Sequence, residues 1–336
     1  MRALVCSEPG RLTVDARPDP RPAAGQALVR VRRAGVCGTD LHIFAGDQPY
    51  LAYPRLIGHE LAGEIVESGA GVALRPGAQV CVIPYLSCGT CGACRRGKTN
   101  CCSELAVMGV HVDGGMAEFV CVPEANAYPA DDVSAEEAAT AEFLAIGAHA
   151  VRRAAPSPGD NALVVGAGPI GVACAIFARR SGAEVTIVDL REDRLAFCAD
   201  RLDFGRTVPG GDGVARRLGE LTGGAFYDAV FDATGSVASM QASFGFVAHG
   251  GVLALVGLAR GAISFSDPDF HKRETTLLAC RNATREDFAA ALDAIRDGAA
   301  PASALVTHRA ALEDAPALFA EWSKPGSGVV KAMLEI

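Results

Sequence analysis

The chain has 336 residues, which at roughly 150 residues per domain suggests two domains. Half of the residues are hydrophobic and 21% are charged, a balance that excludes a disordered chain and favours a globular protein with a sizeable core. The formal net charge of -8 excludes the basic footprint that nucleic acid or an anionic membrane requires.

Neither a membrane-spanning segment nor a targeting segment is visible. The longest apolar runs, 161–165 and 251–258, have the length of strands. Residues 1–10 lack the apolar region of a signal peptide, so we expect a cytoplasmic protein. The 12 cysteines of a cytoplasmic chain should be free thiols or metal ligands rather than disulfides.

The first 145 residues read as short strands separated by Pro, Gly and Asp. Strand-like stretches occur at 27–31, 63–67, 80–83 and 117–122. Short strands at regular intervals predict a barrel-like all-β domain.

The pattern becomes helical after this region. Ser134 is a helix cap with Glu136 and Glu137 in the first turn, and it predicts a helix running through 138–143. A second helix is expected over 144–153, before a Pro-rich break.

From residue 160 strands alternate with helices. Strands are predicted at 162–165, 184–188, 227–232 and 252–257, with helices at 169–181 and 191–201 between them. This alternation predicts an α/β fold with a doubly wound parallel sheet. A last segment carries a predicted helix, 285–297, and a final strand, 329–335.

A glycine pattern opens the first helix of this alternating region. Its members are Gly166, Gly168 and Gly171, with Pro169 and Ile170 between the last two. A Gly-x-Gly-x-x-Gly sequence between a strand and a helix is typical of a dinucleotide site, where backbone N–H groups meet the pyrophosphate.

The next strand ends in Asp189, 18 residues after Gly171. A carboxylate at this spacing binds ribose hydroxyls and repels a 2′-phosphate, so NAD is predicted over NADP. Arg191 and Arg194 lie just beyond Asp189 and weaken the prediction of NAD over NADP.

Five cysteines fall within the 15 residues 88–102, where even scatter predicts about 0.5. Cys88, Cys91, Cys94 and Cys102 offer four thiolates at a spacing that suits closed, structural, tetrahedral zinc. Cys101 is the member left over. Free thiols and a redox Cys-x-x-Cys pair are the alternatives, and no thioredoxin-like unit surrounds the cluster.

A second, dispersed group comprises Cys37, His59, Glu60 and Glu142. A catalytic zinc needs about three protein ligands and one open position. Taken one at a time, the cysteine could be a core residue and the others surface or turn residues.

Several of these segments together resemble the medium-chain zinc-dependent alcohol dehydrogenase family over essentially the whole chain. They are Gly58-His59-Glu60-x2-Gly63-x5-Gly69-x2-Val72, Cys37-Gly38-Thr39-Asp40-x-His42, the four-cysteine lobe and the Gly166–Gly171 sequence. The resemblance implies a GroES-like β-barrel catalytic domain over 1–145, a Rossmann NAD-binding domain over 146–283, and a segment over 284–336 that completes the catalytic domain.

The stretch 141–144 resembles the sorbitol-dehydrogenase-like side of the family, which carries Glu where the classical alcohol dehydrogenases carry Cys. The resemblance implies a catalytic zinc held by Cys37, His59 and a carboxylate. Glu60 and Glu142 are both candidates for that carboxylate, directly or through water.

The resemblance also assigns residues beyond the metal. Thr39 and His42 match a relay that removes the hydroxyl proton, and Asp40 is expected to orient a ligand or to shape the turn. Further cofactor contacts are expected from Arg194, Thr234, Gly235, Val256, Leu258 and Arg281, and pocket contacts from Phe44, Tyr50 and His111. Val256 and Leu258 could instead be core residues, and Arg281 could pair with a substrate carboxylate.

The segments 105–115 and 281–284 look closest to the L-galactonate and L-gulonate 5-dehydrogenases. We therefore expect hydride transfer to NAD from a secondary alcohol carbon of a sugar acid, at C5 of a hexonate. A polyol or L-threonine dehydrogenase with the same zinc chemistry is the alternative. A zinc-free quinone reductase and a non-enzymatic zinc protein are disfavoured, because neither needs both metal groups. The expected assembly is a homodimer or homotetramer, with the apolar strand 252–256 as a candidate edge for pairing between subunits.

Overall fold

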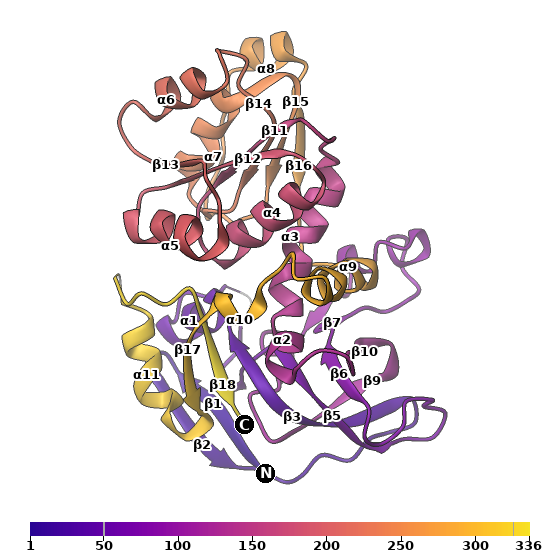
Figure 1. The fold of residues 1–336 in the computed structure, drawn as a ribbon. Coiled ribbons are helices and arrows are strands. Elements are labelled where there is room, and N and C mark those ends of the chain that lie inside the picture. The colour runs from indigo at the N-terminus through magenta and orange to yellow at the C-terminus, as the bar shows by residue number, and fades with distance from the viewer. Residues whose placement is uncertain (50, 325) are drawn as a thin grey trace. The chain divides into compact units, whose positions relative to one another are not determined.

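The computed structural model describes residues 1–49, 51–324 and 326–336 (Figure 1). The chain divides into two compact units. The first unit comprises Met1–Glu142 and Thr284–Ile336, and the second comprises Phe143–Ala283. No helix among the described residues is long and apolar enough to cross a membrane.

The first unit is built on a seven-stranded sheet with the order β10-β6-β5-β3-β18-β17, in which β9 also pairs with β3. Its strands are β3 (Gln26–Val36), β5 (Glu60–Ser68), β6 (Gln79–Val82), β9 (Phe119–Pro123), β10 (Ala127–Pro129), β17 (Val306–Ala311) and β18 (Lys331–Glu335). A smaller sheet has the order β2-β1-β4, from β1 (Arg2–Glu8), β2 (Arg11–Ala16) and β4 (Arg55–Leu56). The predicted barrel-like β domain is confirmed.

The C-terminal segment belongs to this first unit because its last strand lies beside β3. Ala332 pairs with Val36 and Leu334 pairs with Ala34 in antiparallel register. The segment also supplies α9 (Arg285–Arg296), α10 (Ala302–Leu305) and α11 (Ala315–Trp322). Phe319 and Trp322 of α11 are buried in the core of the unit.

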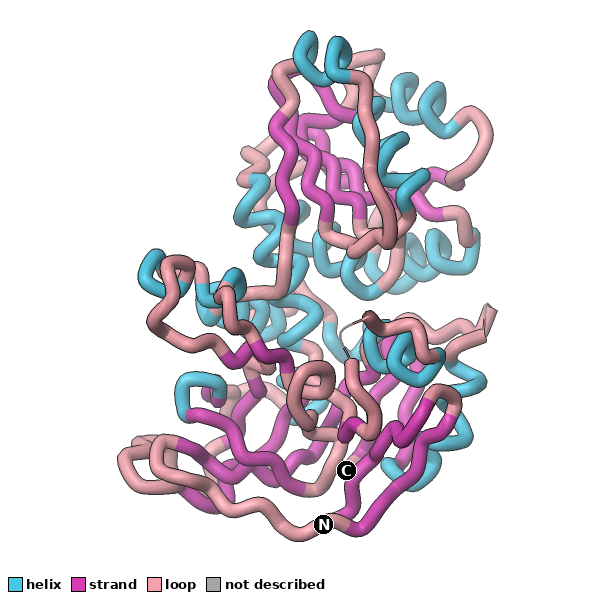
Figure 2. The backbone as a smooth tube through the Cα atoms, turned by 180° about the vertical axis from the view of Figure 1, so that it is seen from behind, coloured by secondary structure: helices cyan, strands magenta, loops and turns pink. Residues whose placement is uncertain are grey.

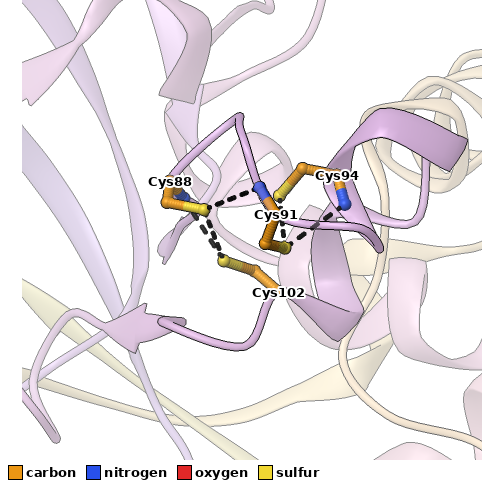
Figure 3. A group of neighbouring side chains, drawn as sticks. All are labelled: Cys88, Cys91, Cys94 and Cys102. Carbon is orange, nitrogen blue, oxygen red and sulfur yellow. Dashed lines mark hydrogen bonds between the residues drawn. The ribbon is translucent and has the colours of Figure 1, made fainter.

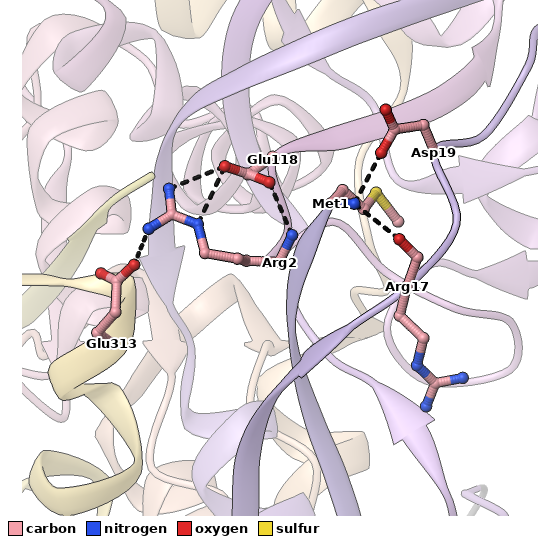
Figure 4. Close-up of polar contacts among 6 residues, drawn as sticks. All are labelled: Met1, Arg2, Arg17, Asp19, Glu118 and Glu313. Carbon is pink, nitrogen blue, oxygen red and sulfur yellow. Dashed lines mark hydrogen bonds and ion pairs between the residues drawn. The ribbon is translucent and has the colours of Figure 1, made fainter.

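Charged contacts at the N-terminus join the same distant segments (Figure 4). The Arg2 guanidinium donates to Glu118 at 2.8 Å and also contacts Glu313 of the C-terminal segment. The Met1 ammonium donates to Asp19 and to the carbonyl of Arg17, both at 2.7 Å. The side chains of Arg2 and Glu313 are about half exposed, so solvent weakens the ion pairs that they make.

Two helices follow β10, and the break between them lies earlier in the chain than predicted. Ser134 and Glu137 form a capping box at the start of α2 (Ala135–Ala139). The helix ends at Thr140, whose hydroxyl donates to the carbonyl of Glu137 at 2.6 Å, and α3 (Ala141–Ala154) begins at once. The prediction of one helix through 138–143 is therefore wrong, and Glu142 lies in the first turn of α3.

The second unit is a six-stranded parallel sheet with the order β13-β12-β11-β14-β15-β16. Its strands are β11 (Asn161–Val165), β12 (Glu184–Asp189), β13 (Thr207–Pro209), β14 (Tyr227–Asp232), β15 (Val247–Leu255) and β16 (Thr276–Ala279). Helices lie along both faces, as Figure 2 shows: α4 (Pro169–Arg180), α5 (Glu192–Leu202), α6 (Val214–Leu221), α7 (Val237–Ser243) and α8 (Asp267–Arg273). This strand order is that of the dinucleotide-binding doubly wound fold, which confirms the predicted fold class.

One detail of this sheet differs from the prediction. The stretch 252–256 was expected at an edge, but β15 is an interior strand that pairs with β14 and with β16. The edge strands are β13 and β16, and the residues of β16 are mostly exposed, including Leu277 at 38%. The sequence did not predict β16, because four residues without flanking turn signals give no distinct strand pattern.

Candidate metal and cofactor sites

Four cysteine side chains converge on a short lobe of the first unit (Figure 3). The lobe lies between β7 (Tyr85–Leu86) and β8 (Ala106–Val107), which pair antiparallel. The Sγ atoms of Cys91 and Cys94 are 3.5 Å apart, as are those of Cys88 and Cys102. A disulfide is much shorter than this, whereas tetrahedral zinc with Zn–S bonds of about 2.3 Å spaces its sulfurs by about 3.8 Å. The donor set fits a closed zinc site, here called the cysteine cage.

Backbone N–H groups point at the sulfurs of the cage. Cys88 donates to the Sγ of Cys102 at 3.3 Å, and Cys91 donates to the Sγ of Cys88 at 3.3 Å. The N–H of Cys94 lowers the pKa of Cys91 to about 5, whereas burial raises the pKa of Cys94 to about 11. N–H donors stabilise thiolates, the form that binds a metal. Cys101 is exposed and lies outside the group.

A second cluster joins residues far apart in the sequence. Cys37 caps the N-terminus of α1 (Gly38–Ala45), a helix that the sequence did not predict, and Glu60 opens β5 directly after His59. Ligand atoms of Cys37, His59 and Glu60 all lie within 4.8 Å of one another. Gly35 makes this possible, because a Cβ there would lie 2.1 Å from Oε2 of Glu60. These three residues and Glu142 are here called the open site.

Glu60 has a buried cationic partner that the sequence did not reveal. The ammonium of Lys331 donates to Oε1 of Glu60 at 2.6 Å, to Oε2 at 2.7 Å and to the carbonyl of Val36 at 3.2 Å. Burial by itself would lower the pKa of Lys331, but the Glu60 carboxylate outweighs it and raises that pKa. Lys331 stands 271 residues from Glu60, so no local pattern could have predicted the pair.

Glu142 has a different partner. Its Oε1 accepts a hydrogen bond from the hydroxyl of Tyr85, and both side chains are buried. Its Oε2 is buried without a hydrogen-bond partner among the described residues. Burial raises the pKa of Glu142, and the charge of nearby His59 opposes that rise. Glu142 is not one of the three residues whose ligand atoms lie within 4.8 Å of one another.

Asp40 lies behind the imidazole of His59. Its Oδ2 accepts from the backbone N–H of Cys37 at 2.9 Å, and its Oδ1 is 3.8 Å from Nδ1 of His59, too far for a hydrogen bond. Burial disfavours a charged His59, but the charges of Asp40 and Cys37 prevail and raise its pKa well above its ordinary value.

The open site fits a divalent cation. Oε2 of Glu142 is buried and lacks a hydrogen-bond partner among the residues that the structure describes. Such groups are costly unless a ligand satisfies them. A thiolate of Cys37 and the two glutamates carry three negative charges, which a divalent cation and the Lys331 ammonium balance. Thiolate, imidazole and carboxylate are also the donors that zinc accepts.

The residues expected in the proton relay lie on α1. Thr39 is half-buried, and His42 is exposed, with Nδ1 at 2.9 Å from Oδ1 of Asp47. Of the three residues expected to line a pocket, Phe44 packs against Phe319 with ring centroids 6.2 Å apart, and Nδ1 of His111 accepts from the N–H of Val107. Tyr50 lies outside the described residues.

The glycine loop of the second unit has the shape that a pyrophosphate requires. Gly166 has a φ of +98°, and a Cβ at Gly171 would lie 1.7 Å from the carbonyl oxygen of Gly166. Gly168 caps α4, with Pro169 and Ile170 in its first turn, and nothing lies within 4 Å of where its Cβ would be. The loop therefore leaves open space before the N–H groups of a helix N-terminus, which suits a phosphate.

Asp189 ends β12 beside this loop. Its carboxylate accepts from the N–H of Ala167 at 2.6 Å and from the N–H of Arg191 at 2.8 Å. The Arg191 guanidinium pairs with Asp193 at 3.0 Å, and burial lowers the pKa of the half-buried Arg194. The carboxylate is thus fixed at the end of β12, while the charge of Arg191 is partly neutralised.

The remaining predicted cofactor residues lie on loops of the same unit. The hydroxyl of Thr234 donates to Oδ1 of buried Asp232 at 2.7 Å. Val256 donates its N–H to the carbonyl of Asp232 at 2.9 Å. Leu258 is 73% exposed, which excludes a core role, and Arg281 is exposed.

Three family models match the chain. The model described as alcohol dehydrogenase GroES-like domain covers residues 23–132, and the one described as zinc-binding dehydrogenase covers 169–297. A third, pyridine nucleotide-disulphide oxidoreductase, covers 126–203, a range that includes the glycine loop.

Two relatives and one solved structure resemble the chain over nearly its full length. L-galactonate-5-dehydrogenase of Escherichia coli K12 is 44% identical over 92% of this chain and 91% of its own. This chain belongs to the zinc-dependent alcohol dehydrogenase family. D-altritol 5-dehydrogenase of Agrobacterium fabrum is 34% identical over 94% of both chains. The structure of the dehydrogenase RspB from E. coli CFT073, complexed with NADH, superposes on this dehydrogenase with a TM-score of 0.93 at 27% identity, covering 100% of this chain and 99% of the other.

These comparisons confirm the family, the fold class, the oxidoreductase reaction and the pairing of zinc with a nicotinamide cofactor that the sequence predicted. The role of each residue and the identity of the substrate are inferred from the geometry of this chain.

Proposed function

We propose that this dehydrogenase oxidises a secondary alcohol carbon of a sugar acid, with a hexonate such as L-galactonate or L-gulonate as substrate, C5 as the reacting carbon and NAD as hydride acceptor. The observation that carries the proposal is the open site, in which ligand atoms of partly exposed Cys37 and of buried His59 and Glu60 lie within 4.8 Å of one another beside buried Glu142. The 44% identical relative that acts on L-galactonate supports the substrate class.

Cys37 and His59 would hold the catalytic zinc together with a carboxylate from Glu60 or Glu142. When bound, zinc supplies Lewis acidity that lowers the pKa of the substrate hydroxyl. Lys331 keeps Glu60 compensated in this buried site, since each carboxylate oxygen can accept from the ammonium and still offer a second lone pair. Asp40 would orient His59 from behind.

Thr39 and His42 would carry the hydroxyl proton to water. Asp47 accepts from Nδ1 of His42, which fixes the tautomer and leaves Nε2 as the proton acceptor. The side chain of His42 is 62% exposed, so the ring can exchange its proton with solvent. An imidazole suits this task near neutral pH.

The second unit would hold NAD. Gly166, Gly168 and Gly171, with Pro169 and Ile170, would receive the pyrophosphate at the start of α4, and Asp189 would accept from the ribose hydroxyls. Thr234, Val256 and exposed Leu258 would contact the nicotinamide end, and Arg194 the adenosine end. The cysteine cage would hold a second, structural zinc.

An NAD-reduction screen of the zinc-loaded enzyme tests this function. L-galactonate, L-gulonate, matched hexitols, D-altritol and L-threonine are compared at equal concentration. We expect the highest kcat/KM on a hexonate and a product oxidised at C5. Activity confined to L-threonine or to simple aliphatic alcohols would overturn the substrate assignment.

We propose that Arg281 contacts the cofactor, and the alternative is that its planar guanidinium pairs with the substrate carboxylate through two parallel hydrogen bonds. In the alternative, Arg281→Ala would lower kcat/KM on a hexonate by about a hundredfold and on the matching hexitol by less than about threefold. Equal losses on both substrates would assign Arg281 to the cofactor.

We further propose that the first unit is the GroES-like catalytic domain and the second the Rossmann domain, with boundaries near 145 and 283. The exposed edge strand β16 supports a homodimer or homotetramer, since an unpaired strand edge is a template for pairing. A cytoplasmic location is supported by twelve free cysteines, five of which lie in groups that could hold a metal ion.

A further inference from the structure

Tyr85 is the one described tyrosine whose hydroxyl touches the open site. It donates to Oε1 of Glu142, and the two residues are 7% and 3% exposed. We propose that Tyr85 is a positioning residue, which fixes one oxygen of Glu142 so that the other is kept available to the catalytic metal or to its bound water. This inference rests on the proposed function.

The hydroxyl can act as a fixed donor because Tyr85 is itself held from several sides. Its backbone pairs with Val107 across β7 and β8, and its carbonyl accepts from Nδ2 of Asn126 at 3.1 Å. Its ring packs edge-to-face on Phe288 of α9, with centroids 6.3 Å apart. Cys88 of the cysteine cage follows two residues after the end of β7.

The two glutamates of the open site differ in what neutralises them. Glu60 is paired with the Lys331 ammonium through both oxygens. Glu142 receives only a neutral hydroxyl among the hydrogen bonds observed for its side chain, and its Oε2 lacks a partner among the described residues. Glu142 therefore has one oxygen held by the Tyr85 hydroxyl and one oxygen without a hydrogen bond among the described residues, and Tyr85 determines which of the two stays open.

A purely structural role for Tyr85 makes a different prediction. A buried tyrosine needs some acceptor for its hydroxyl. On this alternative, Glu142 only satisfies the hydroxyl of Tyr85, and Tyr85 has no effect on the metal site. In that case, removing the hydroxyl would change stability but would leave metal binding at the open site unchanged.

Tyr85→Phe removes only the hydroxyl and keeps the packing on Phe288. The matched control is Tyr128→Phe, which removes the same group from β10 of the same unit and keeps the ring beneath Arg285. Metal-depleted chains are titrated with Co²⁺ and followed by visible absorbance, and a Cys37→Ala chain supplies the spectrum of the cage alone. The steady-state kcat and KM of the zinc-loaded chains are measured in parallel.

We expect Tyr85→Phe to weaken Co²⁺ binding at the open site and to lower kcat by about 10- to 100-fold each, with KM nearly unchanged. In a Glu142→Gln background, the same substitution should change Co²⁺ affinity by less than about twofold, because the residue acts through Glu142. Equal effects in both backgrounds, or Co²⁺ affinity like that of Tyr128→Phe, would overturn the proposal. A wild-type chain without alcohol-dependent NAD reduction would refute the proposed function instead, and the Co²⁺ arm would still decide the role of Tyr85.

Discussion

The cysteine cage and the open site lie in the same unit but are built in opposite ways. The cage draws all four ligands from residues 88–102 and uses backbone N–H groups to stabilise its sulfurs. The open site collects Cys37, His59, Glu60 and Glu142 from three separate stretches, and it places buried charges around them. A site that only holds metal can be local and uniform, whereas a site that must also bind substrate needs mixed donors and unsatisfied atoms.

The largest effect is expected from removing a ligand of the open site. Cys37→Ala should lower kcat/KM by at least about a thousandfold, or about 4 kcal/mol of transition-state stabilisation. Metal analysis should find one zinc per chain instead of two, because the cage is untouched. Retention of two zinc ions, or of near wild-type activity, would contradict the division into two sites.

The buried ion pair tests whether the open site depends on charge balance. Lys331→Met should destabilise the first unit by about 3 kcal/mol, because it leaves the Glu60 carboxylate buried and uncompensated. Adding Glu60→Gln should recover part of the loss, which denaturant unfolding of the single and double variants would measure. Additive losses would show that the two side chains do not depend on each other.

The cage is expected to contribute stability rather than chemistry. Cys91→Ser should remove its metal and cost about 2 kcal/mol, with a lower melting temperature and one zinc per chain. Cys101→Ser is the matched control: this cysteine is exposed and outside the cage, so its substitution should stay within about 0.5 kcal/mol of wild type. Similar losses of stability for both variants would contradict the prediction that Cys101 lies outside the cage.

The Arg2–Glu118 ion pair is more exposed than the buried Lys331–Glu60 pair. Removing it should therefore change the free energy of unfolding less. The N–H of Arg2, at 2.7 Å, is the main cause that lowers the pKa of Glu118. A folded-state pKa below the unfolded one adds stability that is present above about pH 4.3 and is lost as the pH falls below it. Glu118→Gln should therefore lower the melting temperature slightly at pH 7 and almost not at all at pH 3, as thermal melts at the two pH values would show. A pH-independent difference would contradict this.

Sequence alone was sufficient where the chemistry is local. The spacing of Cys88, Cys91, Cys94 and Cys102 predicted a group that the structure brings together, because a short loop can only fold its own ligands inward. The strand before Gly166 and the helix after it predicted the nucleotide loop for the same reason, since turn, cap and close packing are properties of consecutive residues.

Tertiary structure decided everything that depends on distant segments. Lys331 reaches Glu60 only because β18 pairs with β3, and Tyr85 reaches Glu142 only because the helix breaks at Thr140 and starts again. Neither contact leaves a trace in spacing or composition, since a buried ion pair or hydrogen bond is defined by proximity and not by order along the chain. The sequence therefore predicted which residues would bind zinc and NAD. The fold determined that Glu60 is charge-paired with Lys331, whereas Glu142 retains a buried oxygen without a hydrogen-bond partner among the described residues.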